Sequence, residues 1–248
     1  MKSFGLTDKG AFRADNQDCY LLEIVPGKDC LIAVLCDGMG GAKAGEVASQ
    51  LCTKAFVSKV FEKLRSQPGK PMDYRGLLQA SCSETNSVVH AYSQLSDDFH
   101  GMGTTLVGGI IKPNGCGYII NVGDSRAYLL SPKKGQLRQI TRDHSLVEEL
   151  IRFGAITREE AKSHPQRNVI TRAVGTDERI ESDYFYFRLR PGEILLLCSD
   201  GLSNTLDDQE ILEQAKSWPE PEDLCRSLMD MSLERGARDN VTVVAVSR

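Results

Sequence analysis

The stretch LIAVLCDGMGG, from Leu31 to Gly41, decides how this sequence is interpreted. Its apolar run from Leu31 to Cys36 is typical of a buried strand, and Asp37-Gly38 is typical of a turn. We therefore expect the strand to end at Asp37, where a rigid strand end presents a carboxylate to solvent. Asp-Gly is also a common turn dipeptide, so this stretch alone does not predict a binding site.

Three more carboxylates stand at the ends of apolar runs. They are Asp124 after the run 117–122, Asp200 after the run 194–198, and Asp239 before the run 241–246. Four such positions in one chain favour a shared cluster of oxygen ligands, which suits hard divalent cations. Because the four lie far apart in the sequence, the fold has to bring them together.

The composition limits the class of protein. The chain has 248 residues with a net charge of −4, and its basic residues form no Lys/Arg run, so we expect no nucleic-acid partner. No apolar stretch approaches the ~20 residues needed to cross a bilayer, so we expect no membrane span. The start, MKSFGLTDKG, has no apolar signal core, which predicts a cytoplasmic protein.

The cysteines and histidines give no metal signature. The eight cysteines form no Cys-x-x-Cys pair, so we interpret them as buried, reduced thiols. The four histidines are not spaced as helical metal ligands. For His144 and His164 a general-acid role is less favoured than a structural one.

The order of apolar patterns predicts an α+β fold in one domain. Residues 1–36 predict strands that include a hairpin around Pro26-Gly27. A polar stretch, about 145–172, interrupts the later strands. It is interpreted as a flap, with a plain surface insertion as the alternative. The remaining expectations are helices at 44–64 and 74–95 joined by a loop at 67–71, strands at 104–111, 117–122 and 127–130, a short helix at 146–153 and a second opened by a capping box at Thr157, strands at 184–189 and 194–198, helices at 208–217 and 221–234, and a strand at 241–246. This order favours packed antiparallel sheets with helices outside.

The glycines after Asp37 resemble a nucleotide-binding loop only superficially. Lys43 stands where the last glycine of a dinucleotide fingerprint belongs. Gly45 is followed by Glu46 rather than by the lysine of a phosphate-binding loop. We interpret the glycines as allowing the backbone to approach a metal or ligand closely.

Nine stretches, in order along the whole chain, resemble the metal-dependent serine/threonine protein phosphatases of the 2C type in their compact bacterial form. They are Arg13-x-x-Asn16-Gln17-Asp18, Asp37-Gly38-Met39-Gly40-Gly41, Gly45-Glu46-x-Ala48-Ser49, Gly103-Thr104-Thr105, Asn121-x-Gly123-Asp124-Ser125-Arg126, Thr141-x-Asp143-His144-Ser145, Asn168-x-Ile170-Thr171-Arg172-Ala173-x-Gly175, Ser199-Asp200-Gly201-Leu202 and Asp239-Asn240-x-Thr242.

The resemblance implies a four-layer α-β-β-α sandwich, in which helix pairs flank two antiparallel sheets. It implies a single catalytic domain over residues 1–248 with a two-metal site at one end. Asp37 would bridge two Mn²⁺ or Mg²⁺ ions, and the carbonyl of Gly38 would hold one of them. Asp200 and Asp239 would bind the other, and Asp124 with Asp200 would hold a weaker third ion.

Two further residues receive catalytic roles from the resemblance. Asp18 would orient a metal-bound water, and Arg13 would hold the substrate phosphate. A planar guanidinium suits phosphate because it can bond two oxygens at once. For Arg13 the alternative is an ordinary solvated loop arginine, which its place in the motif disfavours.

The implied reaction is hydrolysis of phosphoserine and phosphothreonine by a hydroxide that bridges the two metals. The implied partners are phosphorylated proteins and an opposing kinase, and the implied state is a monomer. Relatives carry a histidine at the place of Met39 or Ala42, so a side-chain general acid is missing and a metal-bound water would replace it. A small-molecule phosphatase and a non-catalytic binding module stay as alternatives. Because Asp37, Asp200 and Asp239 are all present, the binding module is less favoured than the enzyme.

Overall fold

A computed structural model describes residues 1–41, 43–66 and 72–248, and two antiparallel sheets form its centre. One sheet has the order β1-β11-β10-β7-β8, and the other has the order β2-β3-β5-β6-β9, with β4 paired to β3. The strands of the first sheet are β1 (Lys2–Asp8), β11 (Val241–Ser247), β10 (Ile194–Cys198), β7 (Arg126–Ser131) and β8 (Gln136–Gln139). Those of the second are β2 (Asp18–Val25), β3 (Cys30–Met39), β5 (Leu106–Ile111), β6 (Cys116–Val122), β9 (Asp183–Arg188) and β4 (Gly103–Thr104).

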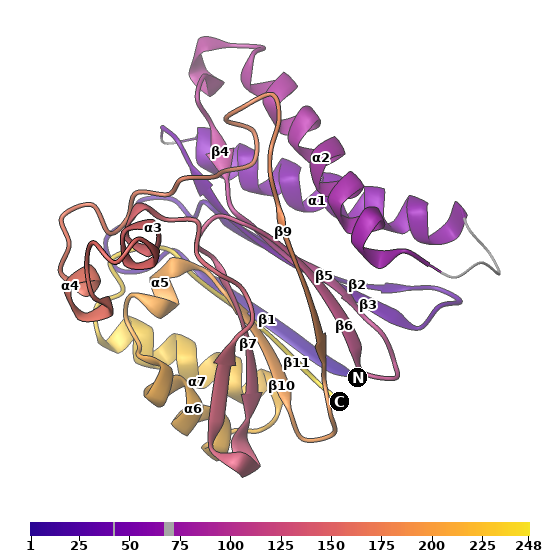
Figure 1. Cartoon of the computed structure of the whole chain (residues 1–248), viewed down its shortest axis with the longest axis vertical. Helices are drawn as coiled ribbons and strands as arrows, with labels where there is room; N and C mark the ends of the chain where they lie inside the picture. The colour runs from indigo at the N-terminus through magenta and orange to yellow at the C-terminus, as the bar shows by residue number, and fades with distance from the viewer. Residues whose placement is uncertain (42, 67–71) are drawn as a thin grey trace.

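Helices cover the outer face of each sheet, as Figure 1 shows. The pair α1 (Ala44–Ser66) and α2 (Tyr74–Ser93) lies on the six-stranded sheet, and α6 (Asp208–Ser217) and α7 (Pro221–Glu234) lie on the five-stranded sheet. A third apolar core fills the space between the sheets. The chain therefore has the expected α+β, four-layer α-β-β-α arrangement.

Strand β3 shows why one apolar run decides the architecture. Ile32 and Val34 pack toward the helices α1 and α2, whereas Ala33 and Leu35 pack between the sheets. All four are fully buried. A strand covered on both faces reads as a continuous apolar run rather than an alternating one. Burial of both faces therefore explains the uninterrupted sequence before Asp37.

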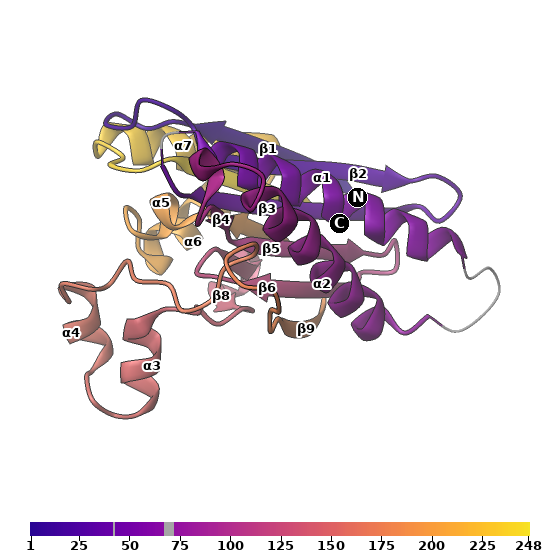
Figure 2. The ribbon, with the colours of Figure 1, turned by 90° about the horizontal axis from the view of Figure 1, so that it is seen from above.

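The segment predicted as a flap carries two short helices, α3 (Leu146–Arg152) and α4 (Arg158–Lys162). Figure 2 shows both projecting from one end of the sandwich, near α5 (Asp200–Ser203). The predicted capping box is present, because the Thr157 side chain accepts from the backbone of Glu160 and the Glu160 side chain accepts from that of Thr157. An isolated bridge between Ser145 and Ile170 closes the base of the segment.

Two expectations about local structure are wrong, and two elements were not predicted. β3 does not end at Asp37 but continues to Met39, because Gly38 pairs with Thr104 of β4. The strand expected over 104–111 is interrupted at Thr105 between β4 and β5. The short helix α5, which Asp200-Gly201 opens, was not predicted. The strand β8 was not predicted at all.

The other elements for which bounds were predicted lie within two residues of them. All eight cysteines are free thiols, and six of them are buried. In the described part of the chain, no helix is long and apolar enough to span a membrane. The loop expected at 67–71 and the position of Ala42 lie outside the described residues.

Candidate active site

Asp37 is held by its backbone at the end of β3. Its N–H donates to the Thr105 hydroxyl at 2.9 Å, and its carbonyl accepts from the Thr105 N–H at 2.8 Å and from the Thr104 hydroxyl at 2.9 Å. Thr105 turns away from the ladder between β4 and β5 to make these bonds. The extension of β3 thus fixes the position of the Asp37 side chain more firmly than a turn would.

Gly38 lies where only a glycine fits. Its N–H donates to the Gln17 carbonyl at 3.0 Å. A Cβ atom at Gly38 would collide with the backbone carbonyl oxygens of Gly45, in the first turn of α1, and of Gln17. The glycine therefore permits three backbone segments to meet directly beside Asp37.

Asp18 lies opposite Asp37 in the antiparallel register of β2 and β3. Its Oδ2 accepts hydrogen bonds from the hydroxyls of Ser199, at 2.7 Å, and Thr242, at 2.6 Å. Ser199 and Thr242 lie at one end of the five-stranded sheet, whereas Asp18 belongs to the six-stranded sheet. The side chain of Asp18 therefore joins the two sheets. Its second oxygen, Oδ1, is buried and accepts no hydrogen bond within the described residues.

Asn240 fixes the loop that carries Asp239. Its amide nitrogen donates to the carbonyls of Lys9, at 2.9 Å, and Asp15, at 3.0 Å. Its amide oxygen accepts from the N–H of Gln17 at 2.8 Å. One side chain thus ties the start of β11 to the loop that precedes Asp18, which places Asp239 beside the other carboxylates.

Asp200 and Asp239 reach the same end of the sandwich by different routes. Asp200 opens α5 directly after β10, and Asn204 donates to its Oδ2 at 3.0 Å. Asp239 forms an ion pair with Arg13, with 2.8 Å between Oδ2 and Nη2. Both side chains of that pair are partly exposed, so this bond alone contributes little to stability.

Asp124 follows a left-handed glycine. Gly123 has a φ of +100°, and its N–H donates to His144 Nδ1 at 3.1 Å while its carbonyl accepts from the His144 N–H at 3.0 Å. Burial, together with the nearby guanidinium of Arg172, lowers the pKa of His144. A neutral imidazole is the form that can accept from Gly123. His144 therefore supports the loop of Asp124.

Burial and neighbouring negative charge raise the pKa values of Asp18, Asp37, Asp124 and Asp200. Burial is the first cause for each: it raises the pKa of Asp18 and of Asp200 to about 6 and that of Asp124 to about 7. The pKa of Asp37 is raised well above its ordinary value by burial, and then by the charges of Asp18, Asp200, Asp124 and Asp239. The five side chains therefore form one electrostatic cluster, which we call the aspartate cluster.

The aspartate cluster has the chemistry of a divalent-cation site. Among the described residues, no three His, Cys, Asp or Glu side chains are already arranged as a metal-ligand group. The carboxylates are close enough to affect one another's ionisation without converging on one point. Buried oxygen donors, raised pKa values and the unpartnered Oδ1 of Asp18 all fit a hard cation, which would remove the repulsion.

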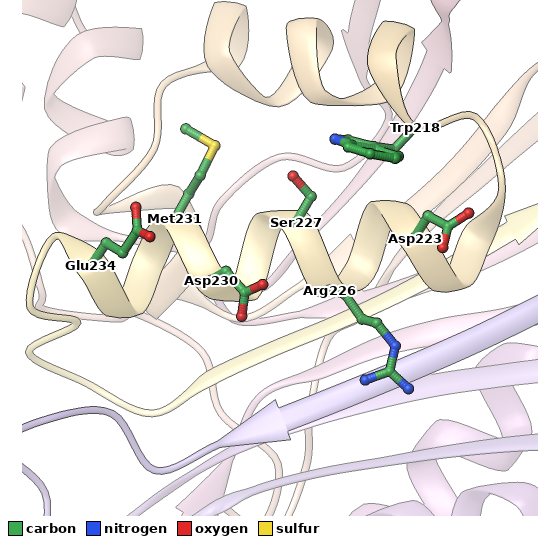
Figure 3. Close-up of a pocket in the computed structure, with 7 residues that line it drawn as sticks. All are labelled: Trp218, Asp223, Arg226, Ser227, Asp230, Met231 and Glu234. Carbon is green, nitrogen blue, oxygen red and sulfur yellow. The ribbon is translucent and has the colours of Figure 1, made fainter.

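A cavity elsewhere lacks these features. It has a volume of about 380 Å³ and lies on the outer side of α7, beneath the Trp218 ring (Figure 3). Its charged lining consists of Asp223, Asp230, Glu234 and Arg226, and no member of the aspartate cluster contributes. The cavity is therefore separate from the candidate active site.

Residues 12–238 match the family described as protein phosphatase 2C. The chain belongs to the protein phosphatase 2C family. The serine/threonine phosphatase stp of Listeria monocytogenes is 37% identical over 243 residues, which cover 98% of this chain and 94% of that protein. The Staphylococcus aureus serine/threonine phosphatase Stp1 superposes with a TM-score of 0.90 at 37% identity, over 100% of this chain and 94% of that one.

A third relative bears on the metals. The catalytic domain of the serine/threonine protein phosphatase PstP, solved in complex with two manganese ions, superposes with a TM-score of 0.83 at 35% identity, over 98% of this chain and 96% of that one. This protein phosphatase 2C thus shares its fold with a relative that holds two manganese ions.

The structure gathers most, but not all, of the residues predicted for the site. The five Asp residues form the aspartate cluster, and Gly38 adjoins Asp37. Arg13 reaches the cluster only through Asp239. The nine motifs contain the supporting residues Ser199, Thr242, Asn240, Thr105 and His144, but the sequence predicted a structural role only for His144 and did not place it in the site. The signal was available for Ser199, Asn240 and Thr242, which lie within three residues of Asp200 or Asp239, whereas Thr105 and His144 lie about twenty positions from Asp124, the nearest Asp of the cluster.

Proposed function

We propose that this chain is a metal-dependent protein phosphatase that hydrolyses phosphoserine and phosphothreonine in proteins. The observation that carries the proposal is the aspartate cluster, five electrostatically coupled carboxylates at one end of a protein phosphatase 2C fold. The proposed substrates are phosphorylated proteins, and the relative PstP is itself named a serine/threonine protein phosphatase.

The metal ligands are proposed from the donor set. Asp37 and the Gly38 carbonyl would hold one Mn²⁺ or Mg²⁺ ion, and Asp37, Asp200 and Asp239 would hold the second. Asp124 and Asp200 would hold a weaker third ion. Bound divalent cations supply positive charge to the phosphoryl oxygens and acidify water at neutral pH. The raised pKa values of the carboxylates support this assignment, because a cation offsets the cost of burying them ionised.

Asp18 is proposed to orient the attacking water. The hydroxyls of Ser199 and Thr242 occupy its Oδ2, and its Oδ1 accepts no hydrogen bond in the described part of the chain. A fixed carboxylate with one free acceptor can hold the proton of a water and aim the oxygen's lone pair at phosphorus. The two hydroxyl bonds prevent the side chain from rotating away.

Arg13 is proposed to bind the substrate phosphate. Its guanidinium now pairs with one oxygen of Asp239. A cation on Asp239 would compete with that ion pair and free the guanidinium for a phosphoryl group nearby. The planar fork can then donate to two phosphoryl oxygens as negative charge redistributes during the displacement.

Three further features of the function are proposed. We propose that residues 1–248 act as one catalytic domain with a flap over about 145–172, that the enzyme is a monomer, and that it opposes a serine/threonine kinase. The family match over residues 12–238 supports the single domain. The side chain at Met39 carries no ionisable group, so the leaving-group proton must come from elsewhere than this position.

The deciding experiment measures phosphate release from a phosphothreonine peptide. The wild type is assayed with Mn²⁺, with Mg²⁺ and with a chelator, beside Asp239→Asn. Asp98→Asn is the matched control, because Asp98 is exposed and lies outside the cluster. We expect metal-dependent release that Asp239→Asn loses and Asp98→Asn keeps. A folded wild type that binds Mn²⁺ but releases no phosphate from the peptide would contradict the proposal.

A further inference from the structure

A second cavity opens between the edges of the two sheets. Its volume is about 300 Å³, and its lining includes Lys134, Arg138, Arg188 and Arg190, with Glu193 as its one carboxylate. Arg138 comes from β8 and Arg188 from β9, the edge strands of the two sheets. We call this cavity the arginine pocket. Its basic residues are scattered in the sequence, and only the fold brings them together.

The strand register explains why Arg138 points into the gap between the sheets. Arg138 pairs with Leu129 of β7, so the two side chains share one face of the sheet. Leu129 packs against the core between the sheets, whereas Leu137 packs against the core under the helices. Arg138 therefore lies on the inner face, at an edge where the opposite sheet no longer covers it.

The carboxylate of the arginine pocket is already occupied. Glu193 is buried; its Oε1 accepts from the Ser131 hydroxyl at 3.1 Å, and its Oε2 accepts from the Arg190 N–H at 3.0 Å. Lys134 lies 3.7 Å from Oε1. Glu193 thus shapes the local backbone and pairs with the lysine, and it leaves the guanidinium groups to other partners.

The three arginines have no such partner. Across residues 1–41, 43–66 and 72–248, the side chains of Arg138, Arg188 and Arg190 form no ion pair and no hydrogen bond. Four positive side chains and one negative side chain give the pocket a formal charge of +3, on a chain whose net charge is −4. An excess of positive charge around one hollow of the surface attracts anions.

We propose that the arginine pocket binds a phosphoryl anion carried by a second phosphorylated residue of the substrate protein. Guanidinium forks match the oxygens of a phosphoryl group and bond it two at a time. The pocket lies at the lower limit of ligand-cavity volumes, which suits a single phosphorylated side chain. This inference rests on the proposed function, because it adds a docking site for the same class of substrate.

The position of the pocket sets the spacing between the two phosphates. Strand β7 runs from the aspartate cluster, two residues after Asp124, to the pocket residue Ser131. Figure 1 shows the end of the β7–β8 hairpin and the β9–β10 connection well away from α3 and α4. At ~3.3 Å per residue the two sites are about 20 Å apart. An extended peptide with phosphates six or seven residues apart spans about that distance.

The test measures binding by calorimetry in the presence of Mn²⁺, and each phosphothreonine of the peptides is replaced by a non-hydrolysable phosphonate analogue so that turnover does not interfere. The ligands are a peptide phosphorylated at two threonines seven residues apart, the same peptide phosphorylated at either one, inorganic phosphate, pyrophosphate and an unstructured oligonucleotide. The proteins are the wild type, the double variant Arg138→Gln/Arg190→Gln, and the control Arg65→Gln/Arg75→Gln. The control removes two exposed charges from α1 and α2, the helices that cover the outer face of the six-stranded sheet.

We expect the wild type and the control to bind the doubly phosphorylated peptide about tenfold more tightly than the pocket variant does. Hydrolysis of p-nitrophenyl phosphate with Mn²⁺ is expected to be equal in all three proteins, and failure there alone would count against the proposed function and not against the pocket. Binding of pyrophosphate that only the pocket variant loses, with no gain from the second peptide phosphate, would assign the pocket to a free phosphate ligand. The inference would be overturned if singly and doubly phosphorylated peptides bind equally well and pyrophosphate does not bind. It would also be overturned if the oligonucleotide binds as tightly as the doubly phosphorylated peptide.

Discussion

The buried charge of Asp18 makes a quantitative prediction about the metal-free protein. Burial raises the pKa of Asp18 from 3.8 to about 6, so ionising this side chain in the folded state costs about 3 kcal/mol. The folded pKa lies above the unfolded one, so between them the native state binds more protons. Stability is therefore lost as the pH rises from about 4 through about 6. Asp18→Asn keeps the shape of the side chain and removes this cost.

The magnitude can be tested by comparing two pH values. At pH 4.5 about a third of the cost is expressed, and at pH 7.5 nearly all of it is. The difference in unfolding free energy between Asp18→Asn and the wild type should therefore shift in favour of the variant by about 2 kcal/mol between these values. Groups outside the aspartate cluster, such as His144, whose pKa is lowered and whose effect on stability has the opposite sign, are common to both proteins and cancel. The charge of Asp18 helps to raise the pKa of Asp37, so its removal lowers that pKa and adds to the shift in the same direction.

The assay is urea unfolding in chelator, followed by circular dichroism, with Asp98→Asn as the control. Asp98 is exposed, so its substitution should give a difference from the wild type that does not change between pH 4.5 and 7.5. If Asp18→Asn gives a difference as constant as that of the control, Asp18 is not the buried, high-pKa carboxyl that the structure describes, and the reasoning fails.

Three more predictions follow from the same end of the sandwich. Mn²⁺ at about 100 times its Kd should stabilise the wild type by about 2.7 kcal/mol in thermal unfolding, and Asp37→Asn should lose most of that gain; equal gains would remove Asp37 from the ligands. Gly38→Ala should lower the unfolding free energy by at least about 2 kcal/mol, because a Cβ atom there collides with backbone atoms. Gly41→Ala is the control and should cost much less, because a Cβ atom at Gly41 has no atom within 4 Å. Similar costs of the two substitutions in urea unfolding would refute the packing argument. Asp143→Asn should cost about 3 kcal/mol by leaving the bidentate, largely buried guanidinium of Arg126 without its partner, and an unchanged melting temperature would show that the pair is not stabilising.

Much of the fold could be predicted because its signals are local. The apolar period of α1, the continuous run of β3 and the capping box at Thr157 each depend on residues close together in the sequence. The extension of β3 past Asp37 could not be predicted in this way, because it depends on pairing with Thr104, more than sixty residues away. The strand β8 could not be predicted for a related reason: it is short and polar, and only its pairing with β7 makes it a strand.

The candidate site likewise combines features that local sequence predicts with features that depend on distant residues. Asp residues at strand edges predicted a cluster, and the structure couples their ionisation. The geometry that holds Asp18 could not be predicted from residue types alone, because Ser199 and Thr242 reach it from the other sheet. The arginine pocket was hidden for the same reason: Arg138 and Arg190 are fifty-two positions apart, and the sequence showed only scattered basic residues.

The bonds to Asp18 also affect how the molecule opens. Because this side chain belongs to one sheet and its two hydroxyl donors belong to the end of the other, the sheets cannot separate at this end while the site stays intact. Amide protons at the ends of β2 and β11 should then exchange with solvent only when the whole domain unfolds, and not through local fraying. A partly opened molecule that is still active is therefore not expected, and loss of catalysis and loss of structure should follow a single cooperative transition.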